Sequence, residues 1–284
     1  MASATVHATR CHPIRPIEAH RTARIHTAYP ERIEYSDDMR PILVIGEVIA
    51  GSDGPTGAGA EVALRLAGDS MPVVLVSRIG HGEIGDRLIR NLRDAGVDCD
   101  SMQYDYDLPT LRSQAIVHDY ERTTAFDQLQ WDSDLETLAR RAAILVVTSG
   151  IRRKGQARST CDRAMLAAEG SPRIFLAQQD TAAIGPVTRT LFGRALELSE
   201  VLVAAPEALE PLRIRTPSDA TELLQRSALL AVLLTKGNAL DVASGDTIRA
   251  IDCPEGDTSL VDSMLKSLAK GLPLNQSLDQ LGSQ

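Results

Sequence analysis

Short apolar runs, each about the length of one strand, alternate with helix-patterned stretches from residue 41 onward. The runs predict strands over 42–45, 73–76, 143–147, 174–177, 201–203 and 230–234. Apolar residues spaced three and four apart predict helices over 58–67, 84–95, 157–169, 187–198, 221–226 and 260–269. Strands that alternate with helices pair in parallel and need cover on both faces. We therefore expect a three-layer α/β sandwich with a mostly parallel central sheet.

One stretch, at about 101–127, breaks this alternation. Residues 115–117 (Ala-Ile-Val) and 123–126 (Thr-Thr-Ala-Phe) flank the polar residues 119–121, a pattern that predicts an antiparallel hairpin. A hairpin outside an α/β sheet can serve as a flap over a binding crevice. Two alternatives stay open, namely an extension of the sheet and a contact for a homodimer or another protein partner.

Residues 1–38 differ from the rest of the chain. They are rich in arginine and histidine and have almost no apolar periodicity. We expect a disordered N-terminal extension, which leaves 39–284 as one domain. Two other interpretations stay open: translation can begin at Met39, directly before the first predicted strand, or the segment can be an organelle transit peptide.

Composition excludes several classes of protein. Hydrophobic content of 43% and charged content of 24% are ordinary for a soluble globular domain. The net charge of -8 argues against nucleic-acid binding, and no apolar run is long enough to span a membrane. The four cysteines are scattered and form no metal or redox motif, so we expect reduced thiols in the cytoplasm and no metal ligand set.

The segment 256–262 (Gly-Asp-Thr-Ser-Leu-Val-Asp) precedes the last of these predicted helices. Asp262 is a candidate general base, because a carboxylate at the start of a helix can accept a proton from a substrate hydroxyl. A structural alternative competes with this role. Ser259 and Asp262 also fit a capping box, with Ser259 as the N-cap and the acid three residues later.

Several motifs, taken in order, resemble the PfkB (ribokinase-like) carbohydrate kinase family. The matching segments are 44–48, the Gly-rich helix start at 57–67, 74–80 with Gly85 and 92–98, Pro109-Thr110 with 121–123, and the 257–262 loop. The resemblance implies a ribokinase-like fold with a β-hairpin lid and transfer of the ATP γ-phosphoryl group to a hydroxyl of a sugar or nucleoside, with Mg as the companion ion.

The same resemblance assigns roles to individual positions. Asp262 matches the catalytic base. Ser259, Leu260 and Val261, together with Gly237, stand at a nucleotide and anion site, where the family has a glycine-rich loop. The positions of the sugar site are Gly51, Gly57 and Glu61.

Many of the family's polar residues are missing at these positions. Gly51 stands where the family has an aspartate, and Glu61 where it has an asparagine. Further departures fall at Gly82, at 177–179 (Ala-Gln-Gln) and at 205–208 (Ala-Pro-Glu-Ala). Only residues 52–56 separate Gly51 from the Gly-rich helix, which is too short for a usual strand pair and its turn. The lid should therefore be reduced.

These losses bear on catalysis, because removing one donor to a developing oxyanion costs about 3–4 kcal/mol of transition-state stabilisation. We therefore predict a carbohydrate-kinase-like protein in which ATP-dependent phosphorylation is impaired or lost, with a binding or regulatory role. The first alternative is an active kinase for an atypical sugar or nucleoside, using Asp262 as base with Glu61 and Asp180 newly recruited. The second is a structural subunit that docks through the hairpin.

Overall fold

The computed structural model describes residues 23–24, 40–113, 123–148, 155–177, 187–253 and 256–281. Its centre is an eight-stranded sheet with the order β13-β12-β11-β10-β9-β8-β2-β5. The parallel strands are β2 (Ile42–Ile45), β5 (Val73–Val76), β8 (Ile144–Thr148), β9 (Arg173–Ala177), β10 (Val201–Ala204) and β11 (Ala231–Thr235). An antiparallel hairpin of β12 (Ala239–Ser244) and β13 (Thr247–Asp252) completes one edge.

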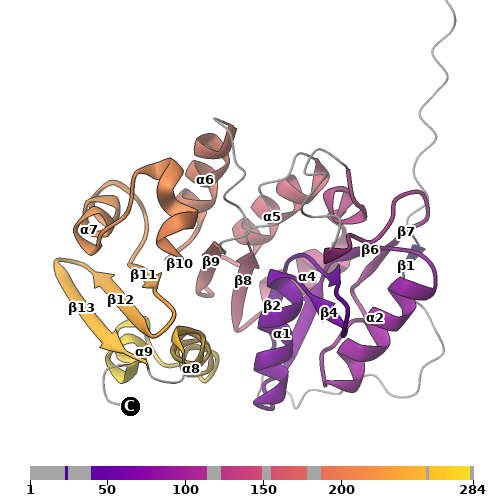
Figure 1. The fold of residues 1–284 in the computed structure, drawn as a ribbon, viewed down its shortest axis with the longest axis horizontal. Coiled ribbons are helices and arrows are strands. Elements are labelled where there is room, and N and C mark those ends of the chain that lie inside the picture. The colour runs from indigo at the N-terminus through magenta and orange to yellow at the C-terminus, as the bar shows by residue number, and fades with distance from the viewer. Residues whose placement is uncertain are drawn as a thin grey trace, which may run out of the picture.

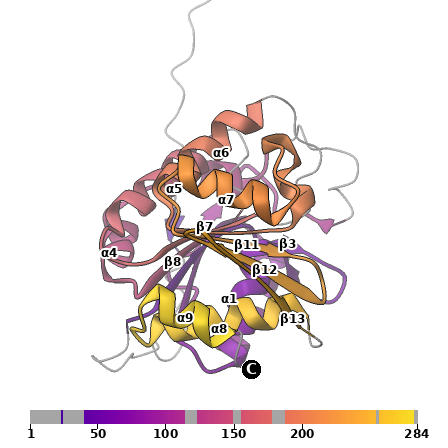
Figure 2. The same ribbon diagram turned by 90° about the vertical axis from the view of Figure 1, so that its left-hand side faces the viewer.

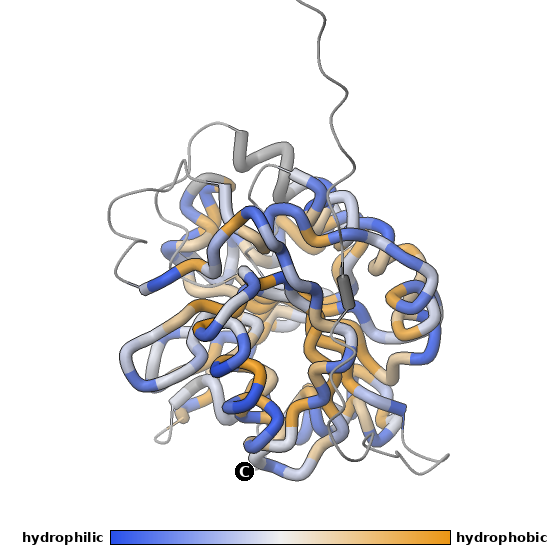
Figure 3. The backbone as a smooth tube through the Cα atoms, turned by 90° about the vertical axis from the view of Figure 1, so that its right-hand side faces the viewer, coloured by the Kyte–Doolittle hydropathy of each residue, from blue (hydrophilic) through white to orange (hydrophobic). Residues whose placement is uncertain are grey.

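Helices cover both faces of this sheet, which confirms the predicted three-layer architecture (Figures 1 and 2). One layer holds α1 (Ala58–Gly68), α2 (Glu83–Asp94), α8 (Asp257–Ala269) and α9 (Leu274–Leu281). The other holds α4 (Ser133–Arg141), α5 (Gln156–Ala167), α6 (Val187–Leu198) and α7 (Pro217–Arg226). Each face of the sheet has its own cluster of buried apolar side chains, and the even and odd residues of a strand alternate between the two clusters. Figure 3 shows hydrophobic stretches toward the inside of the molecule and hydrophilic stretches toward the outside.

The six predicted strands and six predicted helices are all present, with shifted ends in several cases. Helix α7 begins at Pro217 rather than at 221, because Thr216 caps it and proline suits the first helical position. Helix α8 begins at Asp257 rather than at 260. The prediction missed α4, α9 and the β12–β13 hairpin, although Gly245-Asp246 between alternating runs is a hairpin signal.

The predicted lid is wrong in its second arm. Residues 125–128 form a 3-10 helix, η1 (Ala125–Gln128), and not a strand. The reason is a capping box at its start, in which the backbone N–H of Thr124 donates to Asp127 Oδ2 at 2.7 Å. The first arm, 115–117, lies outside the described residues. Docking through this hairpin stays a prediction, and only its first arm can still be a strand.

The segment between Gly51 and the Gly-rich helix holds no complete strand pair, as expected from its length. Strands β3 (Ile49–Ala50) and β4 (Pro55–Thr56) pair antiparallel, and the backbone N–H of Gly51 donates to Gly54 at 2.9 Å within the turn. Strand β3 precedes Gly51, so residues 52–56 contribute only the two-residue strand β4. A lid role for this pair stays a prediction.

A second small sheet contains β6 (Arg78–Gly80), β7 (Gln103–Asp105) and β1 (Ala23–Arg24). Strand β1 belongs to the N-terminal extension and pairs antiparallel with β7. The rest of 1–38 lies outside the described residues, so the disordered tail and the division at residue 39 stay predictions.

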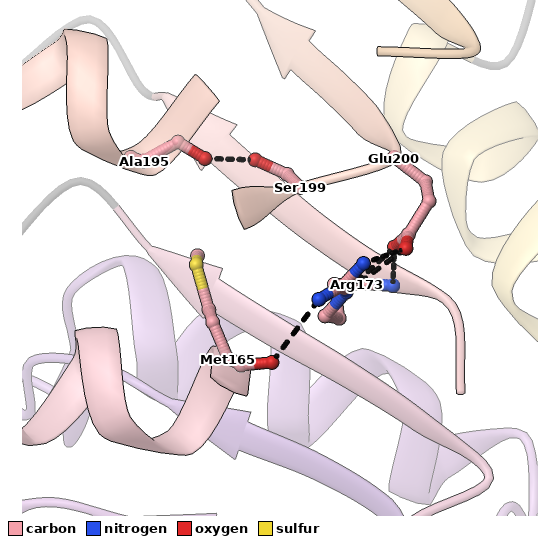
Figure 4. A network of polar contacts seen from close by, with 5 residues as sticks. All are labelled: Met165, Arg173, Ala195, Ser199 and Glu200. Carbon is pink, nitrogen blue, oxygen red and sulfur yellow. Dashed lines mark hydrogen bonds and ion pairs between the residues drawn. The ribbon is translucent and has the colours of Figure 1, made fainter. Parts of the chain in front are cut away.

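At the amino end of the sheet, an ion pair joins β9 to the start of β10 (Figure 4). Glu200 accepts from the Arg173 side chain and also from its backbone N–H at 2.7 Å. The hydrogen bond to Glu200 raises the pKa of Arg173. This network ties two central strands together at the end of the sheet opposite to their carboxyl ends.

Candidate functional site

The strand order creates a switch point between β2 and β8. From β2 the chain continues to β5 on one side, and from β8 it continues to β9 on the other side. In open α/β sheets, ligands bind outside the carboxyl ends of the strands at such a point. The residues that follow β2 and end β8 are therefore the first part of the candidate site.

Gly46 directly follows β2, and its backbone lies against the backbone of Gly59 in the first turn of α1. A Cβ atom at Gly46 would lie 2.7 Å from Gly59 Cα, and one at Gly59 would lie 2.6 Å from the carbonyl carbon of Gly46. The first turn of α1 thus packs directly on the end of β2, which only two glycines permit. The Gly-rich helix start has a clear packing role.

Two buried hydroxyl groups flank Gly46 at this edge. Ile45 pairs with Val76 on one side and Val147 on the other, so the next residues, Ser77 and Thr148, lie beside Gly46. Both side chains are fully buried, and neither hydroxyl has a hydrogen-bond partner among the described residues. Neither residue was predicted as part of a site; the available signal was a hydroxyl residue directly after an apolar strand.

The three predicted sugar-site residues lie near one another on adjacent elements. Gly51 lies in the β3–β4 turn, while Gly57 is the N-cap of α1 with φ of 94°. Glu61 is exposed, and its Oε1 accepts from the backbone N–H of Gly57 at 3.2 Å. Glu61 therefore caps its own helix. Sugar binding by these residues stays a prediction.

The predicted nucleotide residues also come together. Gly237, with φ of 80°, lies in the turn between β11 and β12, and its carbonyl oxygen would be 3.8 Å from a Cβ at Gly256. Gly256 is the N-cap of α8, so this turn adjoins the helix start. The Ser259 hydroxyl donates back to the Gly256 carbonyl at 3.0 Å. Nucleotide binding by this group stays a prediction.

The predicted capping box at Ser259 and Asp262 is wrong. Because α8 begins at Asp257, Asp262 lies in its second turn and not at its third residue. Leu260 and Val261 are buried at 6% and 2% exposure in the core cluster beneath α1 and α8. Backbone N–H groups from the fourth helical residue onward bond within the helix. Those of Leu260 and Val261 therefore do not reach an anion.

Asp262, the candidate base, is engaged by a cation. Its Oδ2 accepts from Arg65 Nε of α1 at 2.8 Å, and the residue is only 5% exposed. Its other oxygen, Oδ1, is buried without a hydrogen-bond partner among the described residues. Burial raises the pKa of Asp262, and the charge and hydrogen bond of Arg65 counteract part of that increase.

A second ion pair lies one helical turn away. Lys266 Nζ of α8 is 2.6 Å from Asp69 Oδ2, just beyond the end of α1. Arg65 faces Asp262 and Asp69 faces Lys266, so α1 and α8 run parallel. Each positive side chain on one helix lies opposite a negative side chain on the other. Asp262 is thus one member of a two-pair helix contact, a role that the sequence did not reveal.

The described residues contain no group of three His, Cys, Asp or Glu side chains placed to hold a metal. Glu207, within the departure at 205–208, lies exposed in the 3-10 helix η4 (Pro206–Leu212). None of the described helices combines the length and the apolar character that a membrane crossing requires.

Neither a protein-family model nor a curated protein matches this sequence. Solved structures do match. A fructokinase from Vibrio cholerae, with fructose, ADP and calcium ion bound, has a TM-score of 0.69 at 18% identity and covers 86% of this chain and 90% of its own. The chain has the ribokinase-like fold.

Two further structures support the same fold. An aminoimidazole riboside kinase from Salmonella enterica, complexed with aminoimidazole riboside and an ATP analog, has a TM-score of 0.67 at 16% identity, with 86% of this chain and 91% of that chain covered. A PfkB protein from a Polaromonas species has a TM-score of 0.66 at 15% identity, with coverage of 86% and 94%. At these identities the likeness establishes the fold and leaves activity to the residues of the site.

Proposed function

We propose that this chain is a carbohydrate-kinase-like protein in which ATP-dependent sugar phosphorylation is impaired or lost, and that it acts by binding a ligand or a partner. The observation that supports this proposal is the ion pair between Asp262 and Arg65. A general base needs a lone pair within hydrogen-bond reach of the substrate hydroxyl. Here one carboxylate oxygen is held by a guanidinium inside a helix–helix contact.

Freeing Asp262 for catalysis has an energetic cost. Breaking a buried ion pair costs about 3–5 kcal/mol, and we take about 2–4 kcal/mol because the Arg65 side chain is 31% exposed. If that energy adds to the barrier of phosphoryl transfer, the rate falls by about 30- to 1000-fold. The burial of Leu260 and Val261 adds to this loss, because it removes the close approach of the helix N-terminus to an anion.

The test is a kinase assay on the full chain with Mg-ATP and a panel of sugars and nucleosides. We expect no ADP release above that of the Asp262→Asn variant. A thermal-shift series with the same panel and with nucleotides measures binding separately. Rapid turnover that Asp262→Asn abolishes would overturn the proposal.

One observation favours a second candidate, an active kinase with an atypical substrate. Asp262 Oδ1 has no hydrogen-bond partner among the described residues, and burial raises the pKa of this carboxyl, as suits a proton acceptor. Arg65 would then orient the base. In that case Arg65→Met should lower kcat strongly and Arg65→Lys should restore part of it. The predicted recruitment of Asp180 falls outside the described residues.

A further inference from the structure

Strand β13 forms an open edge of the main sheet. All six of its residues pair with β12 in continuous register, from Ser244 with Thr247 to Ala239 with Asp252. No described segment lies beyond it: it is at the left boundary of the molecule in Figure 1 and faces the viewer with β12 in Figure 2. An uncovered edge presents a row of unpaired backbone N–H and C=O groups.

The opposite edge of the main sheet is covered. Beyond β5, Asp98 donates to Val73 and accepts from Leu75, both at 2.9 Å, and so closes that edge. Strand β1 pairs with the outer edge of β7. Strand β13 contains no proline, no lysine and no bulge, and its charged residues are Arg249, which pairs with Asp279, and Asp252. The chain thus leaves open the longest of these edges.

The hairpin geometry identifies which backbone groups point outward. The turn has two residues, and its first, Gly245, has φ of 56°. In a two-residue hairpin the pair next to the turn exchanges both hydrogen bonds, and bonded pairs then alternate along the strands. Thr247, Arg249 and Ile251 therefore bond to β12. The backbone groups of Ile248, Ala250 and Asp252 point outward, and these three residues are exposed.

We propose that β13 pairs with β13 of a second copy of this chain, antiparallel about a two-fold axis at Ala250. In this register, Ala250 pairs with Ala250 of the partner subunit, and Ile248 pairs with Asp252 of the partner subunit. Every outward-facing group of both strands is then bonded, which gives about six intermolecular hydrogen bonds. The two sheets become one continuous sheet.

Side chains favour this register over its neighbour. Moving the axis to Arg249 would place two arginines opposite each other, and like charges in that position are destabilising. At Ala250 two methyl groups meet instead. Arg249 is directed to the α9 side, where its Nη1 lies 3.0 Å from Asp279 Oδ1. The exposed Ile248, at 45%, gains cover from the partner strand.

The first test is the oligomeric state of the full chain by analytical ultracentrifugation between about 1 and 100 µM, because a six-residue edge is at the small end of interfaces. We expect reversible dimers. Ala250→Arg should give monomers, because it places like charges at the axis, whereas the matched control Ala250→Ser should dimerise like the parent. A parent that stays monomeric throughout, or an Ala250→Arg variant that dimerises equally, overturns the proposal.

The second test measures the register by cross-linking in a Cys11→Ser background, since Cys99, Cys161 and Cys253 are buried. Directly paired residues have Cα atoms about 5.5 Å apart, within disulfide range, so Ala250→Cys should form a disulfide-linked dimer under mild oxidation. Ile248→Cys is the control, because its two copies would be about 13 Å apart along the strands. Equal cross-linking at both positions, or cross-linking at 248 alone, refutes this pairing. Circular dichroism checks that each variant is folded, and neither test depends on the proposed loss of kinase activity.

Discussion

The substitution Arg65→Met tests the structural role of Asp262 most directly. Methionine keeps much of the apolar stem of arginine but removes the guanidinium that binds Asp262 Oδ2 at 2.8 Å. Because Asp262 is 5% exposed and its Oδ1 has no partner, the carboxyl group would keep no hydrogen bond from the described residues. Breaking one side of a buried pair costs about 3–5 kcal/mol. With Arg65 31% exposed, solvent screening reduces the expected loss to about 2–4 kcal/mol at pH 7.5.

The pH dependence of this loss has a defined sign. Burial already raises the pKa of Asp262, and removing Arg65 raises it further. Between the unfolded and folded pKa values, the native state then binds more protons than the unfolded state, so the stability of the variant increases as pH falls. The difference in unfolding free energy between parent and Arg65→Met should therefore shrink when pH is lowered from 7.5 toward 5.

Urea unfolding followed by far-UV circular dichroism measures this difference at several pH values. Lys266→Met is the matched control, because it breaks the neighbouring pair, in which Asp69 is 43% exposed, and should cost about 0.5 kcal/mol. The double variant Arg65→Met/Asp262→Leu should recover most of the lost stability. A loss below about 0.5 kcal/mol for Arg65→Met, or a loss independent of pH, would refute the structural role of the pair.

Three further predictions concern the packing around the site. Gly59→Ala should lower stability by about 2–3 kcal/mol in urea unfolding, because its Cβ would lie 2.6 Å from backbone of Gly46, whereas Gly68→Ala in the same helix, with nothing within 4 Å, should change stability by less than about 1 kcal/mol; equal effects would contradict the close approach. Arg78→Met should cost about 3–5 kcal/mol, because Arg78 is 2% exposed and pairs with Asp105 at 3.0 Å; a two-state melt within 1 °C of the parent would argue against that pair. Cys99 should resist a thiol reagent at pH 8 in the native protein, because burial raises its pKa to about 12; labelling at the rate of a free thiol would contradict its burial.

Much of the scaffold could be predicted because its signal is local. Each strand of the parallel core is buried on both faces, so its amino-acid sequence is a continuous apolar run such as 42–45. The elements that were missed or misplaced depend on local polar chemistry. The capping box of Thr124 and Asp127 converts a strand-like stretch into η1, and the Gly245-Asp246 turn creates the β12–β13 hairpin.

The motif order named the candidate site positions, and their binding and catalytic roles stay predictions. The motif order located Asp262, Gly237 and the Gly-rich start of α1, and the structure brings Gly237 beside the start of α8. It could not indicate that Arg65 holds Asp262, because these residues are 197 positions apart and meet only when α1 and α8 pack side by side. Ser77 and Thr148 were equally hidden, since their position beside Gly46 follows from strand order.

The amino-acid sequence by itself determined the layers, the strands and the motif positions, because burial and backbone preference act over a few residues at a time. The tertiary structure alone decided that the candidate base is ion-paired, that Leu260 and Val261 fill the core, and that β13 is left at an open edge. Each of these depends on which distant segments become neighbours, and that choice is made by the packing of the whole chain.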